Sequence, residues 1–357
     1  MIAFFLRRVC FLLSLLVPSL FVTGCDQSDK DISSMEKIAS YEGGDRGQRL
    51  IAAAKKEGSL SFYTSLAAQK LEKIAADFEN RYGIKVNTWR AGDDKVLQRI
   101  LIETKAGRFD FDAVHMESTE LEALHREKLL QEIKSPYLKD LIPEAVPPHR
   151  QWAPTVLNVI VQAYNTDKVK KTELPKTYED LLDPRWRGRL GFESKDQEWF
   201  YTVVKDMGEE RGLKFFKDLV SRNGLSVRSG HSLLNNLTAS GEIPLALTVY
   251  SHMPMLAKRE GASIDWFVIE PAIAISFGVG VSQKAPHPNA AVLFYDYMIN
   301  DAQQLLASMD YVPTNKKVAS PLQGVQIKLV DPAVVLDSYE KWNKLYEEII
   351  LRPKPNP

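Results

Sequence analysis

Two long, almost uninterrupted apolar runs place the strongest constraint on how this chain can fold. They occupy residues 155–164 and 273–281, and both are predicted to be strands. The segment between them alternates short strands, such as residues 190–192 and 243–249, with helical patterns. A chain that leaves one lobe along the first long strand and returns along the second builds two lobes. We therefore expect a cleft between them.

The region before the first long run has the same alternating pattern. Short strands are predicted at residues 60–63, 84–89 and 111–115, with amphipathic helices between them. Gly83 is expected to end the first of these helices. A βαβαβ order indicates a parallel sheet. The predicted fold class is therefore α/β, with two α/β lobes joined by crossing hinge strands.

The first 25 residues have the form of a lipoprotein signal. Arg7 and Arg8 precede an apolar run, and Val22-Thr-Gly-Cys25 follows it as a lipobox. The run is shorter than the roughly 20 residues that span a bilayer, which argues against a transmembrane helix. We expect residues 1–24 to be removed, Cys25 to be acylated and residues 25–45 to form a flexible tether. Asp26 favours retention at the inner membrane, so the expected location is the periplasm.

Charge and cysteine content narrow the possible functions. The whole chain has 46 basic and 46 acidic residues, so no basic excess points to nucleic acid. Its two cysteines are Cys10, which leaves with the signal, and Cys25, which would carry lipid. The folded part therefore has no thiol for a disulfide, a nucleophile or a sulfur-ligated metal.

Candidate ligand-binding residues follow the predicted strands, because open α/β sheets bind ligands beyond the carboxyl ends of their strands. Hydroxyls, small residues and arginine recur there. The predicted binding residues are Tyr63, Thr64, Ser65, Arg90, Glu117, Ser118, Asp196, Arg228, Ser229, His231 and Tyr250. For the serines, helix capping is the alternative interpretation. For Arg228, it is an exposed position beside a capped helix.

Metal and hydrolase motifs are absent from the sequence. His115 and His125 lack the spacing of two ligands on one helical face, and there is no His-Glu-x-x-His, so a zinc site is not expected. No Gly-x-Ser-x-Gly occurs. A serine paired with His231 or His252 would be an arrangement that sequence cannot expose. A periplasmic hydrolase therefore stays only as a remote alternative.

From about residue 44 to 317 the chain resembles the extracellular solute-binding proteins of ABC importers, in the group labelled ferric-iron type or family 1. The order and spacing of several short segments carry the resemblance: Leu60-Ser-Phe-Tyr-Thr-Ser65, Phe109-Asp-Phe-Asp-Ala-Val114, Asp183-Pro-Arg-Trp-Arg-Gly188, Ser240-Gly-Glu-Ile-Pro244 and Gly278-Val-Gly-Val-Ser282.

This resemblance implies a type II periplasmic binding protein fold, with residues 46–157 and 275–320 in lobe 1 and residues 158–274 and 321–357 in lobe 2. It implies a non-enzymatic protein, expected to be a monomer without a cofactor, that delivers its ligand to an inner-membrane permease.

The resemblance leaves the ligand open. Ferric-binding members hold iron through adjacent tyrosines, whereas Tyr250 is followed here by Ser251. Ser, Thr, Arg and His around the cleft favour a small organic anion or oxyanion. The alternative is ferric iron or a ferric complex, held by Tyr250, His252 and Glu117.

Overall fold

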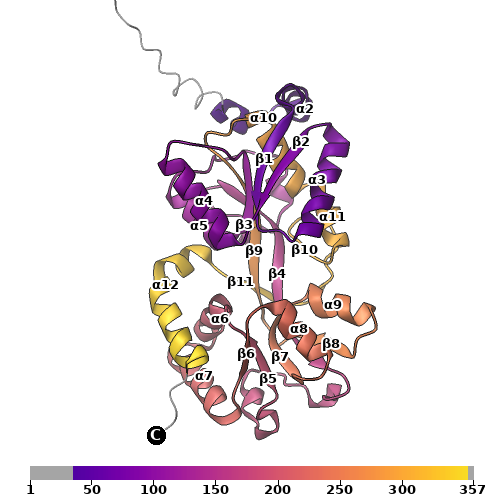
Figure 1. Cartoon of the computed structure of the whole chain (residues 1–357), viewed down its shortest axis with the longest axis vertical. Helices are drawn as coiled ribbons and strands as arrows, with labels where there is room; N and C mark the ends of the chain where they lie inside the picture. Colours follow the sequence, from indigo (N-terminus) through magenta and orange to yellow (C-terminus); the bar gives the residue numbers. More distant parts are fainter. Residues whose placement is uncertain (1–34, 353–357) are drawn as a thin grey trace, which may run out of the picture.

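The computed structural model describes residues 35–352, which form two lobes stacked along the long axis of the molecule (Figure 1). Two strands connect the lobes: β4 (Trp152–Asn165) and β9 (Ala272–Val281). They pair in antiparallel fashion, with Leu157 opposite Ser276. Every residue of β4 is buried, which explains its continuous apolar sequence. The two predicted long strands and their hinge role are confirmed.

Lobe 1 contains the predicted βαβαβ unit. Its strand β1 pairs in parallel with β2 on one side and β3 on the other, and β3 pairs antiparallel with β9. Its elements are α2 (Arg46–Glu57), β1 (Ser59–Thr64), α3 (Ala68–Tyr82), β2 (Lys85–Arg90), α4 (Asp93–Lys105), β3 (Ala113–Glu117), α5 (Ser118–Arg126), the short η1 (Leu138–Asp140) and η2 (Pro143–Ala145), α10 (Pro288–Ile299), α11 (Ala302–Ser308) and β10 (Val312–Pro313). Gly83 ends α3 with a positive φ of 69°, as predicted.

Lobe 2 repeats the alternating pattern. Strand β5 pairs in parallel with β6 and β7. The carboxyl ends of the three strands therefore lie at the same edge of the sheet, and this edge faces the cleft. Its elements are η3 (Lys171–Glu173), η4 (Glu179–Leu182), η5 (Pro184–Trp186), β5 (Leu190–Glu193), α6 (Gln197–Met207), α7 (Glu209–Asn223), β6 (Ser226–Arg228), α8 (His231–Ala239), β7 (Leu245–Tyr250), α9 (His252–Arg259), β8 (Ile264–Phe267), β11 (Ile327–Leu329), α12 (Pro332–Tyr346) and the π-helical η6 (Glu347–Leu351).

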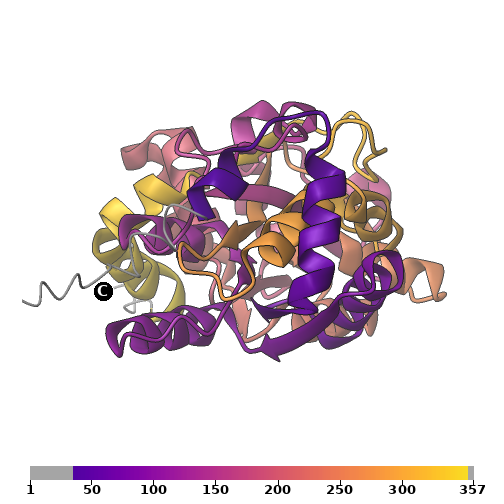
Figure 2. The same ribbon diagram turned by 90° about the horizontal axis from the view of Figure 1, so that it is seen from above.

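The expected flexible tether is wrong for its last part. Residues 35–40 are helical, and Met35 and Ala39 are buried in the core of lobe 1. Their spacing of four residues places both on one face of a helix, a pattern that the polar surroundings conceal. The buried Arg46 follows, and its Nε lies 2.9 Å from Asp296 of α10. Figure 2 shows α2 and α10 side by side at this end of the molecule.

The predicted signal peptide and Cys25 lie outside the described residues. Within residues 35–352, no helix combines the length and the apolar character that crossing a bilayer requires. The largest element that the sequence reading did not predict is α12, which packs Trp342 and Tyr346 into the core of lobe 2.

Candidate binding site in the interlobe cleft

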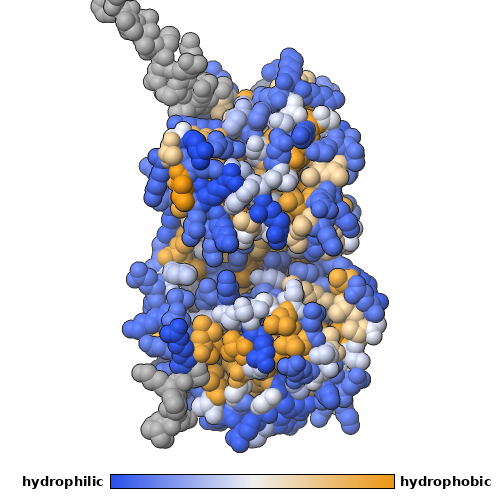
Figure 3. Space-filling model, viewed as in Figure 1, coloured by the Kyte–Doolittle hydropathy of each residue, from blue (hydrophilic) through white to orange (hydrophobic). Residues whose placement is uncertain are grey.

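A cavity of about 640 Å³ lies between the lobes, and a groove crosses this face of the molecule at the same level (Figure 3). Its lining comes from the segments that follow β2, β3, β5, β6 and β7, together with α12. This is the position expected for a ligand at the carboxyl ends of the strands.

Lobe 1 contributes a cluster of three carboxylates. Asp93 begins α4, Glu117 ends β3 and Glu120 lies in the first turn of α5. Acidic residues in a first helical turn interact favourably with the helix dipole, which suits these positions locally. Each residue offers an oxygen within 4.8 Å of the other two. Asp93 Oδ1 also accepts a hydrogen bond of 3.0 Å from the backbone N–H of Glu117, which fixes the cluster.

Lobe 2 contributes Asp196, His231 and Tyr250. The Nδ1 atom of His231 lies 3.3 Å from the carbonyl oxygen of Thr248, which can only accept, so Nδ1 carries the proton. The other ring nitrogen, Nε2, faces Asp196 Oδ1 at a distance of 3.3 Å. A backbone carbonyl that fixes the tautomer in this way is typical of histidines that bind metals. The ring of Tyr250 lies 4.0 Å from that of His231, between centroids.

Glu193 supports this half of the site. Its carboxylate accepts hydrogen bonds from the backbone N–H groups of Gly230 and Lys195. It thus connects the end of β5 to the start of α8, which carries His231. The side chain is used mainly to hold this loop in place.

Burial and crowding raise the pKa values of the acidic groups. Burial, with the charges of neighbouring carboxylates, raises the pKa of Glu117 and Glu120 well above the ordinary range. Burial raises the pKa of Glu198, at the start of α6, to about 7. The pKa of Tyr250 is raised by burial and by the charge of Glu117. For His231, burial opposes protonation, but Asp196 and Glu193 outweigh it and raise its pKa.

Several buried oxygens in the cleft have no hydrogen-bond partner among the described residues. They are Asp196 Oδ2, Glu120 Oε2 and Glu198 Oε2. Asp196 is only 4% exposed. A buried carboxylate without a partner is costly, so these atoms require protons or a bound cation.

The net charge of the lining is opposite to what an anion needs. Seven carboxylates line the cavity, against one lysine, Lys195, and one histidine, His231; the carboxylates are Asp93, Asp94, Glu117, Glu120, Glu193, Asp196 and Glu198. Lys195 is exposed. The electrostatics therefore oppose the anionic ligand that the sequence favoured.

The structure brings five of the predicted binding residues to the cavity and places the others elsewhere. Those that line it are Glu117, Asp196, Ser229, His231 and Tyr250. Arg228 lies outside the lining, and its Nη2 is 3.8 Å from Glu242 on the surface. Arg90 is exposed and donates to the carbonyl of Leu66.

The remaining predicted residues have structural partners or lie behind the cavity wall. The hydroxyl of Tyr63 bonds to Glu103 at 3.2 Å, and Thr64 Oγ1 accepts from the N–H of Leu66. Ser65 and Ser118 have buried hydroxyls that do not line the cavity. His252 lies between Tyr250 and Tyr311, where burial lowers its pKa to about 3.

Most of the acidic residues that line the cavity were not among the binding residues predicted from the sequence. Asp93, Glu120 and Glu198 each lie in the first turn of a helix that follows a strand. Three acids in equivalent positions at three strand ends were the available signal. They were overlooked because an acid in a first turn is also an ordinary helix-stabilising choice.

Comparison with known proteins decides the family. A family model described as "Bacterial extracellular solute-binding protein" matches residues 111–331. The chain belongs to this family. Iron uptake protein A1 of Synechocystis sp. is 28% identical to this solute-binding protein over 287 residues, which cover 73% of this chain and 79% of that protein.

Solved structures confirm the predicted type II periplasmic binding protein fold. Iron-bound HitA from Pseudomonas aeruginosa matches with a TM-score of 0.72 and 22% identity, covering 82% of this chain and 99% of its own. AfuA from Actinobacillus pleuropneumoniae, with fructose-6-phosphate bound, matches with a TM-score of 0.70 and 20% identity, covering 83% and 100%. This protein is thus a periplasmic solute-binding protein of an ABC importer and not an enzyme.

Proposed function

We propose that this solute-binding protein binds ferric iron in its acidic cleft and delivers it to an inner-membrane permease. The observation that carries the proposal is the concentration of carboxylates in the cleft, three of them with buried oxygens that lack a partner. Fe(III) is a hard cation, and anionic oxygens are its preferred protein ligands.

The two lobes supply complementary halves of a ligand set. Asp93, Glu117 and Glu120 offer oxygens from lobe 1, while Asp196, His231 and Tyr250 offer donors from lobe 2. The carboxylates thereby take the place of a second tyrosine, because the residue after Tyr250 is Ser251. Because the halves belong to different lobes, a cation bound by both favours the closed arrangement over the open one.

Two of the relatives support this assignment by their names. Iron uptake protein A1 is named for iron, and the HitA structure contains iron. AfuA shows that the same fold also accommodates a sugar phosphate. An anion of that kind needs donors and positive charge, whereas the lining here is dominated by acceptors.

An organic cation with ammonium groups is the second candidate. The cavity of about 640 Å³ is favourable to it, because this volume is within the range of sites for small organic molecules and far exceeds that of one ion. Carboxylates bind ammonium groups through charge-assisted hydrogen bonds.

A visible absorption spectrum tests the ferric assignment. Added ferric citrate should produce a tyrosinate-to-iron charge-transfer band that disappears in Tyr250→Phe. The matched control is Tyr63→Phe, whose hydroxyl bonds to Glu103 away from the cavity, and it should keep the band. Absence of iron binding, with an ammonium compound found by native mass spectrometry, would replace iron by the second candidate.

We also propose that the mature chain is anchored by lipid at Cys25, on the basis of the lipobox Val22-Thr-Gly-Cys25. A Cys25→Ala chain should be released from membranes or remain uncleaved. If Cys25→Ala protein of mature size were found in the membrane fraction, as wild type is, the proposed lipid anchor would be refuted.

A further inference from the structure

Helix α12 runs along the side of the cleft and contacts both lobes (Figure 1). It packs against α5 of lobe 1 and against α6 of lobe 2. Its residues Tyr339, Asn343 and Tyr346 line the cavity. The family match ends at residue 331, and α12 begins at Pro332, so the helix lies beyond the matched region.

The C-terminal half of α12 is fixed firmly to lobe 2. Trp342 and Tyr346 are buried in the core of that lobe, 5% and 1% exposed. The hydroxyl of Tyr346 donates to the backbone carbonyl of Glu193 at 2.8 Å and accepts from the N–H of Asp196 at 3.3 Å. This one hydroxyl therefore spans the turn that presents Asp196 to the cleft.

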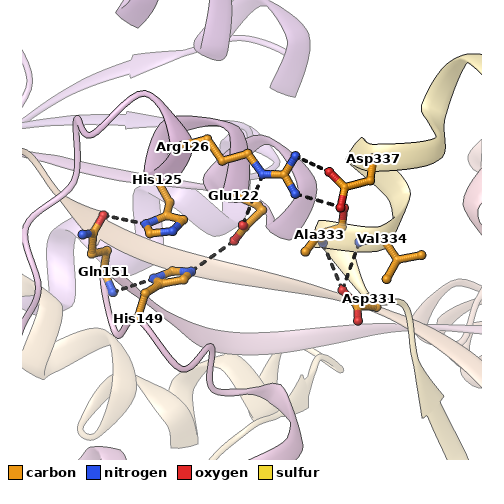
Figure 4. Close-up of polar contacts among 9 residues, drawn as sticks. All are labelled: Glu122, His125, Arg126, His149, Gln151, Asp331, Ala333, Val334 and Asp337. Carbon is orange, nitrogen blue, oxygen red and sulfur yellow. Dashed lines mark hydrogen bonds and ion pairs between the residues drawn. The ribbon is translucent and has the colours of Figure 1, made fainter.

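The N-terminal half of α12 is attached to lobe 1 by exposed contacts (Figure 4). Arg126 Nη1 lies 2.7 Å from Asp337 Oδ1, and Nη2 donates to the carbonyl of Ala333 at 3.1 Å. The Arg126 and Asp337 side chains are 40% and 67% exposed. Arg126 is the last residue of α5, whose first turn carries Glu120 of the lobe 1 carboxylate cluster.

We propose that α12 positions the cation site: Tyr346 holds the Asp196 turn in place, and Arg126 ties this half of the site to lobe 1. The proposal rests on the proposed cation-binding function of the cleft. Tyr346 and Arg126 are positioning residues, since they act through Asp196 and through the lobe arrangement.

The two attachments differ in strength, and this difference suits a protein that opens and closes. Exposed ion pairs contribute little to stability and break readily. A buried hydroxyl with two hydrogen-bond partners loses free energy when those bonds break, because no water is there to replace them. The helix therefore moves with lobe 2, while the Arg126 contacts form or break as the lobes change their angle.

Titration with terbium(III), a hard trivalent ion with measurable emission, tests the Tyr346 part. Tyr346→Phe should weaken Tb(III) binding about tenfold and shorten the emission lifetime, because a displaced Asp196 leaves a coordination position to water. The matched control is Tyr201→Phe, which alters a tyrosine packed on Trp342 outside the cavity lining. A role limited to folding would lower the melting temperature and leave affinity and lifetime unchanged.

Small-angle scattering tests the Arg126 part. Arg126→Gln should increase the radius of gyration of the ligand-free protein, and Arg126→Lys should restore part of the change. The control is Arg211→Gln, which removes an exposed ion pair with Glu179 inside lobe 2.

The outcomes separate this inference from the proposed function. Wild type that binds Tb(III), with Tyr346→Phe and Arg126→Gln indistinguishable from their controls, would overturn the positioning role and leave the cation site standing. Wild type that binds neither Tb(III) nor Fe(III) would overturn both.

Discussion

Two of the clusters that bring metal-ligating side chains within 4.8 Å of one another contain histidine, among the residues that the structure describes, and they differ in what their atoms already bind. The acidic cleft contains Asp196 and His231 with Glu193. The second cluster contains Glu122 and His125 of α5 and His149, which lies in the segment before β4 (Figure 4). By residue type alone, the second cluster has the more usual metal ligands.

The second cluster is satisfied internally. The rings of His125 and His149 stack at 3.6 Å with an interplanar angle of 9°. An ion lies in the plane of an imidazole that binds it, so two parallel stacked rings cannot share one. His149 Nε2 lies 3.1 Å from Glu122 Oε2. The other ring nitrogen of His149, Nδ1, accepts a hydrogen bond from the backbone N–H of Gln151.

The cleft has the opposite character. Asp196 Oδ2 is buried without a partner among the described residues, and His231 is held by the carbonyl of Thr248 with Nε2 toward Asp196 Oδ1. The comparison teaches that short distances between ligand types do not define a site. Buried carboxylate oxygens that lack a partner do.

Substitution of one side chain in each cluster should separate the two clusters most clearly. Asp196→Asn should weaken Tb(III) binding by about a hundredfold, near 3 kcal/mol, because a charged ligand is lost from a buried site. His125→Gln should bind like wild type. Calorimetric titration measures both, and equal losses in the two variants would remove the distinction between the clusters.

The pH dependence of stability should also be dominated by the cleft. Burial raises the pKa of Glu198 to about 7 in the folded, ligand-free protein. Its unfolded value is about 4.3, so the protonated form stabilises the fold at low pH, and this contribution is lost as pH rises through about 7. The loss amounts to roughly 4 kcal/mol for one such carboxyl.

The melting temperature of the ligand-free protein should therefore fall between about pH 5 and about pH 8, and Tb(III) should restore it at the higher pH. Glu198→Gln should make this fall smaller, while the raised pKa values of Glu117 and Glu120 keep part of it. A melting temperature that stays constant or rises over this interval would contradict the pKa assignment.

Loss of the oriented imidazole should have a smaller effect. His231→Gln should reduce Tb(III) affinity about thirtyfold, near 2 kcal/mol, because one neutral donor is removed while the carboxylates stay. Unchanged affinity would show that His231 serves only as the partner of Asp196.

The smallest effect is expected in the second cluster. His125→Gln breaks the ring stack, and its loss should lower the free energy of unfolding by about 1 kcal/mol. Urea denaturation measures this change. A variant that lost cation affinity as well would connect the second cluster to the cleft.

Much of the architecture follows from local pattern. The alternation of short strands and amphipathic helices predicted the parallel β1, β2 and β3 unit, and the apolar runs predicted β4 and β9. Helix α12 escaped prediction although Val335, Trp342 and Tyr346 bury on one side of it. Val335, Trp342 and Tyr346 recur at helical spacing, so the sequence contained a signal for this helix that was not used.

The sequence by itself determined the two-lobed α/β frame, because hydrophobic periodicity and turn residues act over short stretches of chain. Only the tertiary structure decided the sign of the charge that lines the cleft. With 46 basic and 46 acidic residues, the chain shows no charge excess as a whole. Folding brings Asp93, Glu117, Glu120, Asp196 and Glu198 from separate segments to the lining of one cavity. Electrostatic energy depends on separation and local dielectric, which the order of residues along a chain does not contain.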